Sequence, residues 1–281
     1  MAQLKTEYSQ CELCQALEIS GSGFQGHQHK EQQPRRQRDR QLIALLGSIF
    51  ERSRHTYGSP RLCAALHQVG QRCGKNRIRR LMRQQRWQPR YKRPFRPQTT
   101  NSSHALPIAA NRLPGLAAPT APNQVWQSDI TYLSTAQGRL YLAVTLDRFS
   151  RRVVGWQLGA SLETSLVTEA LARAQKERRP CPGLLHHSDR GVQYASSACR
   201  ALLATFQMQP SMSRKANCYD NALVESFFAT LKTECFGQQL PLSYQEARLR
   251  IFDYIETFYN PKRLHSALGF KSPVDFENQS H

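Results

Sequence analysis

A proline-rich stretch divides this chain of 281 residues into two parts with different hydrophobic periods. Residues 98–122 hold four prolines and, at residues 99–103, a run of Thr, Asn and Ser, and such a composition permits little regular structure. Before this stretch apolar residues recur at helical spacing, and after it short runs of β-branched and aromatic residues predict strands. We therefore expect an all-α domain, a linker over residues 98–122 and a mixed α/β domain.

The part before the linker predicts helix-turn-helix structure. Residues 41–97 are expected to form one domain, in which the apolar spacing places helices at residues 41–52, 59–69 and 75–87. A shorter and weaker pattern in residues 1–40 predicts a further helix-turn-helix-like segment, whose first helix would cover Cys11–Leu17.

The positive charge of the chain is concentrated in this helical part. The whole sequence has 39 Lys and Arg against 20 Asp and Glu, and residues 35–96 hold 18 of these bases against only Asp39 and Glu51, a net charge of +16. Interleaved apolar residues argue against a disordered tail, and a basic helix placed second in a helix-turn-helix is the element that enters the major groove of DNA. The predicted DNA-binding residues are Lys75, Arg77, Arg79, Arg80, Arg83, Arg86, Arg90, Lys92, Arg93 and Arg96.

The part after the linker predicts an α/β core built on one sheet. Strands are expected at residues 126–133, 140–146, 152–158, 183–187 and 208–212. Helices are expected at residues 163–176, at 196–205 and around Glu225. The order β-β-β-α-β-α-β-α is that of the RNase H-like (integrase-type) fold, in which the first and fourth strands are parallel and adjacent. We expect this core to span residues 123–236 and a C-terminal helical extension to follow at residues 237–281.

Three carboxylates lie where this fold would bring them together. Asp129 is in the first strand, Asp189 follows the fourth strand, and Glu225 is on the last helix of the core. A buried ionised carboxylate needs compensation, and a divalent cation is the strongest compensation available. Mg²⁺ prefers oxygen ligands, and two such ions about 3.5–4 Å apart can promote in-line displacement at phosphorus. The sequence therefore predicts Asp129, Asp189 and Glu225 as catalytic residues and as ligands of two Mg²⁺ (or Mn²⁺) ions.

Other polar residues near these acids have different expected roles. Asp147 ends the second strand, which runs antiparallel to the first, so we expect a turn residue bonded to nearby backbone. His187 and Asn221 are expected to lie beside the metal ligands without binding the metal themselves. Lys232 follows Glu225 by two helical turns on the same face, where its ammonium can contact a DNA strand that leaves the reactive phosphate.

The order and spacing of these motifs resemble one known family. The chain is similar to the insertion-sequence transposases of the IS-three family, in particular to the second-frame (OrfB-like) product with its retroviral-integrase-like Asp-Asp-Glu core. The similarity extends from about residue 40 to residue 278. The motifs that carry it are Trp126–Tyr132, Leu146–Arg151 with Val154-Gly155-Trp156, His187–Tyr194, Asp220–Phe227, and Tyr259-Asn260-Pro261 through Pro273.

The resemblance implies a DNA transposase that cuts the ends of an insertion element to free a 3′-OH, which then attacks a second phosphodiester. It also implies a circular intermediate before insertion and a partner, or a fusion, from the upstream reading frame. The substrates would be double-stranded DNA of the terminal repeats and of the target, and at least a homodimer is expected because two ends must be held together. Two alternatives stay open: a nuclease or resolvase that uses the same acids without strand transfer, and a DNA-binding regulator with an inactive core.

The composition also bears on the compartment. No apolar run approaches the roughly 18 residues of a membrane span, and the eight cysteines are scattered in a way that fits reduced thiols. The expected location is the bacterial cytoplasm, in association with the nucleoid.

Overall fold

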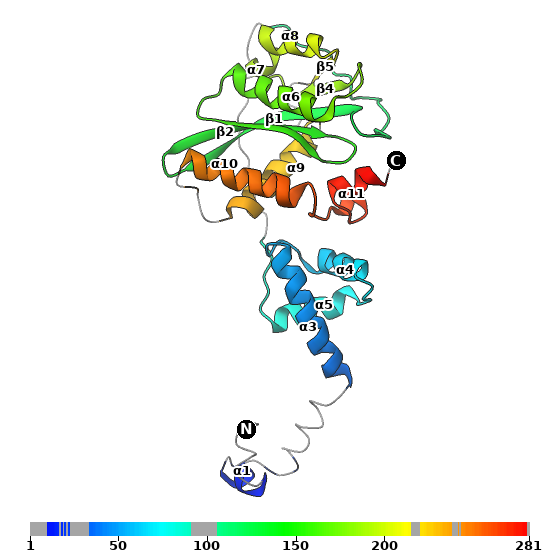
Figure 1. Ribbon diagram of the computed structural model, residues 1–281, viewed down its shortest axis with the longest axis vertical. Helices are drawn as coiled ribbons and strands as arrows, with labels where there is room; N and C mark the ends of the chain where they lie inside the picture. Colours follow the sequence, from blue (N-terminus) through cyan, green and yellow to red (C-terminus); the bar gives the residue numbers. More distant parts are fainter. Residues whose placement is uncertain are drawn as a thin grey trace. The chain divides into compact units, whose positions relative to one another are not determined.

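The chain divides into two units that differ in secondary structure, residues 1–89 and residues 90–281 (Figure 1). The first unit is helical, and the second contains one sheet with helices on both faces. The structure, a computed structural model, describes residues 10–16, 18, 20, 22, 34–90, 106–214, 220–237, 241 and 243–279. Within these residues, no helix combines the length and the apolar character that crossing a membrane requires.

The first unit follows the predicted helical pattern. Its described helices are α1 (Gln10–Ala16), α3 (Pro34–Arg52), α4 (Ser59–Gln68) and α5 (Lys75–Gln84). Their apolar spacing is explained by burial, because Leu46, Leu62 and Ile78 are completely buried. Helix α1 confirms the helix predicted over Cys11–Leu17, whereas most of the turn and second helix predicted after it lie outside the described residues.

Helix α5 ends earlier than its apolar pattern predicts. The helix stops at Gln84, and Arg86 then adopts a left-handed backbone with φ +56°. This reversal carries Trp87 back to α3, where the indole stacks on Phe50 with ring centroids 5.6 Å apart. The prediction of Arg86 on the basic helix is therefore wrong, because the helix ends two residues earlier and the chain reverses to stack the half-buried Trp87 on α3.

The sheet of the second unit has the predicted topology. Its strands are arranged in the order β3-β2-β1-β4-β5, and β1 pairs antiparallel with β2 and parallel with β4. This arrangement confirms the RNase H-like (integrase-type) fold. The strands are β1 (Val125–Thr135), β2 (Gly138–Asp147), β3 (Val153–Gly159), β4 (Leu185–Ser188) and β5 (Gln209–Met212).

Helices cover both faces of this sheet (Figure 1). One face carries α6 (Thr164–Arg178), α7 (Val192–Ala195) and α8 (Ser197–Thr205); the other carries α9 (Ala222–Leu231), α10 (Tyr244–Phe252) and α11 (Pro273–Asn278). Trp126 and Ile130 of β1 pack into the core under α6. Since side chains alternate along a strand, Gln127 and Asp129 face α9. The α9 side is therefore the face on which the predicted acids lie.

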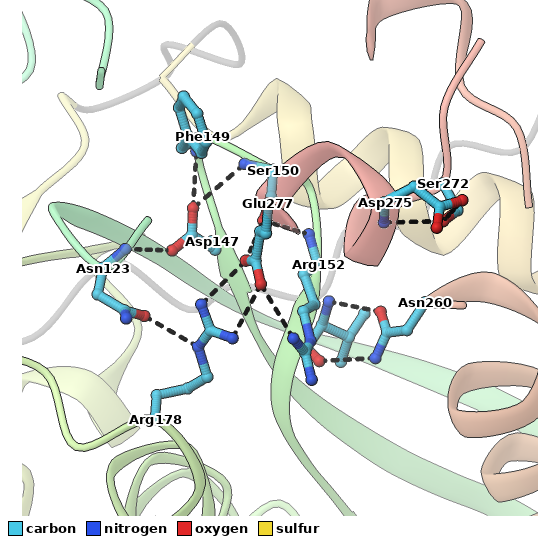
Figure 2. Close-up of polar contacts among 11 residues, drawn as sticks. Asn123, Asp147, Phe149, Ser150, Arg152, Arg178, Asn260, Ser272, Asp275 and Glu277 are labelled. Atoms are coloured by element: carbon cyan, nitrogen blue, oxygen red, sulfur yellow. Dashed lines mark hydrogen bonds and ion pairs between the residues drawn. The ribbon is translucent and has the colours of Figure 1, made fainter. Parts of the chain in front are cut away.

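The C-terminal extension is tied to the sheet by polar side chains (Figure 2). Helices α9 and α10 each continue as a π-helical segment, η2 (Lys232–Phe236) and η3 (Asp253–Tyr259), and a short 3₁₀ helix η4 (Ser266–Leu268) precedes α11. Asn260 accepts a hydrogen bond from the Val153 N–H and donates one to the Val153 carbonyl, 3.0 and 2.9 Å, so it completes the edge of β3.

The described part of the predicted linker, residues 106–122, packs on the core of the second unit. Residues 91–105 lie outside the described residues, but residues 106–122 run along the core without forming a helix or strand. Leu113 packs with Val125 and Leu185, and the Arg112 N–H donates to Ser211 Oγ at 2.9 Å. Residues 106–122 are thus anchored by a buried leucine and a buried serine, and the linker over residues 98–122 as a whole stays a prediction.

Candidate active site

Asp129 and Asp189 emerge side by side from two parallel strands. Strands β1 and β4 are paired up to Ser128 and Ser188, so each aspartate is the next residue beyond the last pair. Asp129 Oδ1 accepts a hydrogen bond from the Ile130 N–H at 2.8 Å. Asp189 Oδ1 accepts one from the Gly191 N–H at 2.9 Å, where a Cβ on Gly191 would stand only 3.0 Å from the same oxygen.

Glu225 joins these aspartates from the first turn of α9, with an exposed side chain. Burial, and after it the charges of Asp189 and Glu225, raise the pKa of Asp129 well above its usual range, against the hydrogen bond from Ile130. The charges of the other two predicted residues therefore both act on Asp129.

The donor set of this group fits a hard divalent cation. Three carboxylates supply only oxygen ligands, and their mutual repulsion is the feature that a cation removes. In the described part of the chain, no three His, Cys, Asp or Glu side chains lie close enough together to bind one metal ion. The side chain of Glu225 is exposed, whereas the helix that carries it is anchored at its start.

The anchor of α9 is the pair of residues that precede it. The Asp220 carboxylate accepts hydrogen bonds from Asn111 Nδ2 at 2.8 Å and from the Arg214 N–H at 3.2 Å, and its carbonyl accepts one from Gln127 Nε2 at 2.8 Å. The Asn221 carbonyl accepts the N–H groups of the first turn, including that of Glu225 at 3.2 Å. Asn221 Oδ1 is buried and has no hydrogen-bond partner among the described residues. The expectation that Asn221 lies beside the metal ligands stays a prediction.

His187 lies between two hydroxyls, one in the neighbouring strand β5 and one just beyond its end. Its ring nitrogens are 2.9 Å from Ser211 Oγ and 3.0 Å from Ser213 Oγ. Burial lowers the pKa of His187 to about 4, with a smaller opposite effect from Asp220, so the ring is neutral near pH 7. A neutral ring bonded to β5 supports the end of β4, and its predicted place beside the metal ligands remains a prediction.

Tyr194 is the residue near the acids that the sequence reasoning missed. It is 2% exposed, and its hydroxyl has no hydrogen-bond partner among the described residues. Burial, followed by the charges of Asp129 and Asp189, raises the pKa of this hydroxyl well above its usual range. In the sequence, its position five residues after Asp189 is the feature that could have pointed to Tyr194; in the structure it lies on the one-turn helix α7.

Asp147 is not part of the site, as predicted. Its carboxylate is completely buried and accepts hydrogen bonds from the backbone N–H groups of Asn123, Phe149 and Ser150 at 2.6, 2.8 and 3.2 Å (Figure 2). Asp147 is therefore a structural turn residue at the end of β2.

Lys232 begins the π-helical segment η2 that follows α9. Its ammonium lies 4.8 Å from the centroid of the Tyr132 ring, and burial lowers its pKa to about 8. The lysine is therefore held against β1, three residues beyond Asp129, rather than extended on a free surface.

The predicted DNA-binding residues Lys75 to Arg83 lie on α5 of the first unit, and those from Arg90 onward belong to the second unit. Arg77 and Arg80 both bind Asp39, at 2.7 and 2.6 Å, and their hydrogen bonds lower the pKa of that carboxylate although burial opposes the change. Lys75, Arg79 and Arg83 are exposed on α5. Of the others, Arg90 donates to the Glu234 carbonyl at 2.7 Å, and Lys92, Arg93 and Arg96 lie outside the described residues.

Comparison with known proteins agrees with this architecture. The integrase core domain family matches residues 119–218 and 225–281, and the HTH-like domain family matches residues 37–95. The chain is 42% identical over 269 residues to the insertion element IS600 uncharacterized 31 kDa protein of Shigella sonnei, covering 96% of this chain and 98% of that protein. It is 37% identical over 278 residues to transposase InsF for insertion sequence IS3A of Escherichia coli (strain K12), covering 98% and 96%.

Solved structures also match part of the chain. A chain of the simian T-cell lymphotropic virus intasome in complex with PP2A regulatory subunit B56 gamma has 18% identity and a TM-score of 0.49, covering 76% of this chain and 70% of that chain.

An integrase-type core preceded by an HTH-like domain defines a DNA transposase, a polynucleotidyl transferase of the Asp-Asp-Glu type that depends on a divalent metal. The extent of identity with the insertion-sequence proteins then gives the family. The chain belongs to the IS-three family of insertion-sequence transposases. The resemblance inferred from the motifs is confirmed, and neither the resolvase nor the regulator alternative is favoured.

Proposed function

We propose that this chain binds the ends of its insertion element and catalyses 3′-end cleavage followed by strand transfer, with Asp129, Asp189 and Glu225 as the catalytic residues. The observation that carries the proposal is the position of the two aspartates, each directly beyond the last residue pair of two parallel strands. Burial and the nearby charges of Asp189 and Glu225 raise the pKa of Asp129, and this supports a site that binds cations.

The three carboxylates would hold two Mg²⁺ or Mn²⁺ ions, which supply activation of the attacking oxygen and stabilisation of the leaving oxygen. The chain's own groups orient the acids. The N–H groups of Ile130 and Gly191 each fix one carboxylate oxygen and so set the direction of the other. Asp220 anchors the start of α9 to β1 and keeps Glu225 within reach of the aspartates.

DNA binding would be divided between the two units. The exposed bases of α5 would enter the major groove of the terminal repeat, and release of counterions from phosphates would supply most of the affinity. Lys232 would contact the reacting strand close to the acids. We also propose at least a homodimer, a fusion or partner from the upstream frame, a circular intermediate, and action on nucleoid DNA in the cytoplasm.

Substitution of the three acids tests the chemistry. Asp129→Asn, Asp189→Asn and Glu225→Gln should each abolish cleavage and joining while leaving end binding nearly intact, because each removes a metal ligand charge at nearly constant shape. The assay is a divalent-metal reaction on DNA that carries the sequences bordering the coding region. Asp147→Asn is the contrast, since it should lower stability more than chemistry.

The products separate the possible functions. Joined DNA supports a transposase, DNA that is cut but never joined supports a nuclease, and bound but unchanged DNA supports a regulator. Activity above a few per cent of wild type in any one triad variant would remove that residue from the catalytic group.

A further inference from the structure

A polar pocket lies on the α9 side of the sheet, between residues of β1, of the turn after β2 and of the start of α9. Its volume is about 230 Å³, and it is lined by Gln127, Arg148, Arg151, Asp220 and Leu223. One water molecule needs only about 10–15 Å³ of space measured in this way. The pocket is therefore large enough for a group several times the size of a water molecule.

The two arginines of this pocket carry charges that the described protein does not neutralise. The side chains of Arg148 and Arg151 are partly exposed, and neither guanidinium has a hydrogen bond or ion pair within the described residues. The next residue, Arg152, differs, because it binds Glu277 at 2.9 Å. The N–H donors of each guanidinium in the pocket are therefore available to a ligand. Their planar arrangement can bind two oxygens of a phosphate group.

Asp220 is the one acid that lines the pocket, and other groups already bind it. Its side chain is 10% exposed and bonds to Asn111 and to the Arg214 backbone, with the Arg214 guanidinium 3.6 Å away. The remaining lining is neutral, since Gln127 and Leu223 carry no charge. The pocket therefore favours an anion.

The position of the pocket relates it to the reaction site. Gln127 precedes Asp129 by two residues on the same face of β1, a separation of roughly 6.6–6.8 Å along a strand. Leu223 precedes Glu225 by two residues on α9. A DNA strand whose reactive phosphate lies at the acids would have a neighbouring phosphate within reach of the pocket.

We propose that Arg148 and Arg151 bind a DNA phosphate adjacent to the phosphodiester that reacts. This inference rests on the proposed transposase function and adds a contact that positions the reacting strand. The ligand is a backbone phosphodiester, which either the element end or the target DNA could supply. Two guanidinium groups on one phosphate set its place more tightly than the flexible ammonium of a lysine.

Neutral phosphate analogues in the DNA test the contact with the full-length protein. Single methylphosphonate linkages are introduced at successive positions, in one series of end duplexes and in a second series of target duplexes. For wild type, one linkage in one series should weaken binding by about 10- to 100-fold, as expected for loss of charged hydrogen bonds. For Arg148→Gln/Arg151→Gln, binding of unmodified DNA should fall by the same factor, and the same linkage should cause no further loss.

The salt dependence gives a second reading of the same contact. Loss of one phosphate contact should reduce the slope of log affinity against log salt by about 0.9 for the double variant. Lys176→Gln is the matched control, because this exposed lysine lies on α6, on the opposite face of the sheet. It should keep the wild-type sensitivity to the methylphosphonate at every position.

Equal sensitivity of wild type and the double Gln variant at every linkage would overturn the proposal. If that variant does not fold, the double Lys variant Arg148→Lys/Arg151→Lys tests the contact instead. It should bind the unmodified DNA several-fold more weakly than wild type and be less sensitive to the same linkage. Binding equal to that of wild type would contradict the contact. Because these are binding measurements, they remain decisive even if wild type fails to cut or join DNA. That failure would refute the proposed function and leave the phosphate contact to be judged separately.

Discussion

Replacement of Glu277 by Gln should destabilise the second unit strongly although Glu277 lies far from the acids in sequence. Its carboxylate is 5% exposed and bonds to Ser150 Oγ at 2.7 Å, to Arg152 at 2.9 Å and to two nitrogens of Arg178 at 2.9 Å (Figure 2). One carboxylate therefore joins α11, the turn after β2, and α6. Glutamine keeps one acceptor oxygen, removes the charge, and presents an NH₂ group to guanidinium donors.

The magnitude follows from the burial of the two arginines. Removing one partner of a fully buried ion pair costs about 3–5 kcal/mol. The side chains of Arg152 and Arg178 are 24% and 12% exposed, so water partly replaces the lost contacts. Burial chiefly, and the Glu277 charge in addition, raise the pKa of Asp147, so losing that charge also relieves a small repulsion. We expect a loss of about 2–4 kcal/mol, or roughly 4–16 °C in melting temperature for a unit of this size.

The measurement is thermal and urea unfolding of the full chain at pH 7, with the transition of the second unit followed by tryptophan fluorescence. Glu246→Gln is the matched control, because its pair with Arg250 is a local one on α10 with both side chains 32% exposed. This change should alter stability by less than about 0.5 kcal/mol. A Glu277→Gln effect no larger than that of the control would show that the three elements do not depend on this carboxylate.

Two further predictions concern buried groups beside the acids. Burial lowers the pKa of His186 to about 3 and that of His187 to about 4, whereas in the unfolded chain both titrate near 6.5. The unfolded state therefore binds more protons than the folded state below that pH, and the free energy of unfolding should fall by about 1 kcal/mol per histidine between pH 6 and pH 5. In denaturant unfolding, His187→Gln should remove about half of this pH dependence. An unchanged pH dependence would contradict the prediction. Tyr194→Phe removes a buried hydroxyl without a partner among the described residues, so in metal-free buffer its melting temperature should equal or exceed that of wild type. A clear decrease would reveal a hydrogen bond to that hydroxyl.

The topology could be predicted because each strand and helix carries its own local pattern. Strand lengths, a glycine-containing turn and one long amphipathic helix are enough to give the element order, and that order restricts the sheet to few arrangements. The role of Asp147 could be predicted for the same reason, since its partners Phe149 and Ser150 are local.

The interactions that could not be predicted are those between residues distant in sequence. Arg77 and Arg80 are assigned by sequence to DNA, yet both bind Asp39, which lies 38 and 41 residues earlier. Leu113 is in a proline-rich stretch and nevertheless packs on Val125 and Leu185. The π-helical segments leave no sequence period of their own, because one inserted residue shifts the pattern without replacing it.

The π-helical segment after α9 is held in place by the C-terminal extension. Glu234 of this segment is 6% exposed, and its carboxylate binds Arg263 at 2.6 and 2.7 Å and the Tyr254 hydroxyl at 2.8 Å. Both partners follow α10 in the sequence and belong to the C-terminal extension. The extension therefore holds the segment whose first residue is Lys232.

A lysine on a free surface would lose much side-chain entropy when it binds a phosphate, about 2 kcal/mol for a long flexible stem. Lys232 instead begins a segment whose backbone is already fixed, and its ammonium is placed over Tyr132. With a pKa of about 8 the side chain stays mostly charged at pH 7 and loses its charge in mildly alkaline solution. The extension thus fixes the segment that places this ammonium over Tyr132, and a contact of Lys232 with the reacting DNA strand stays a prediction.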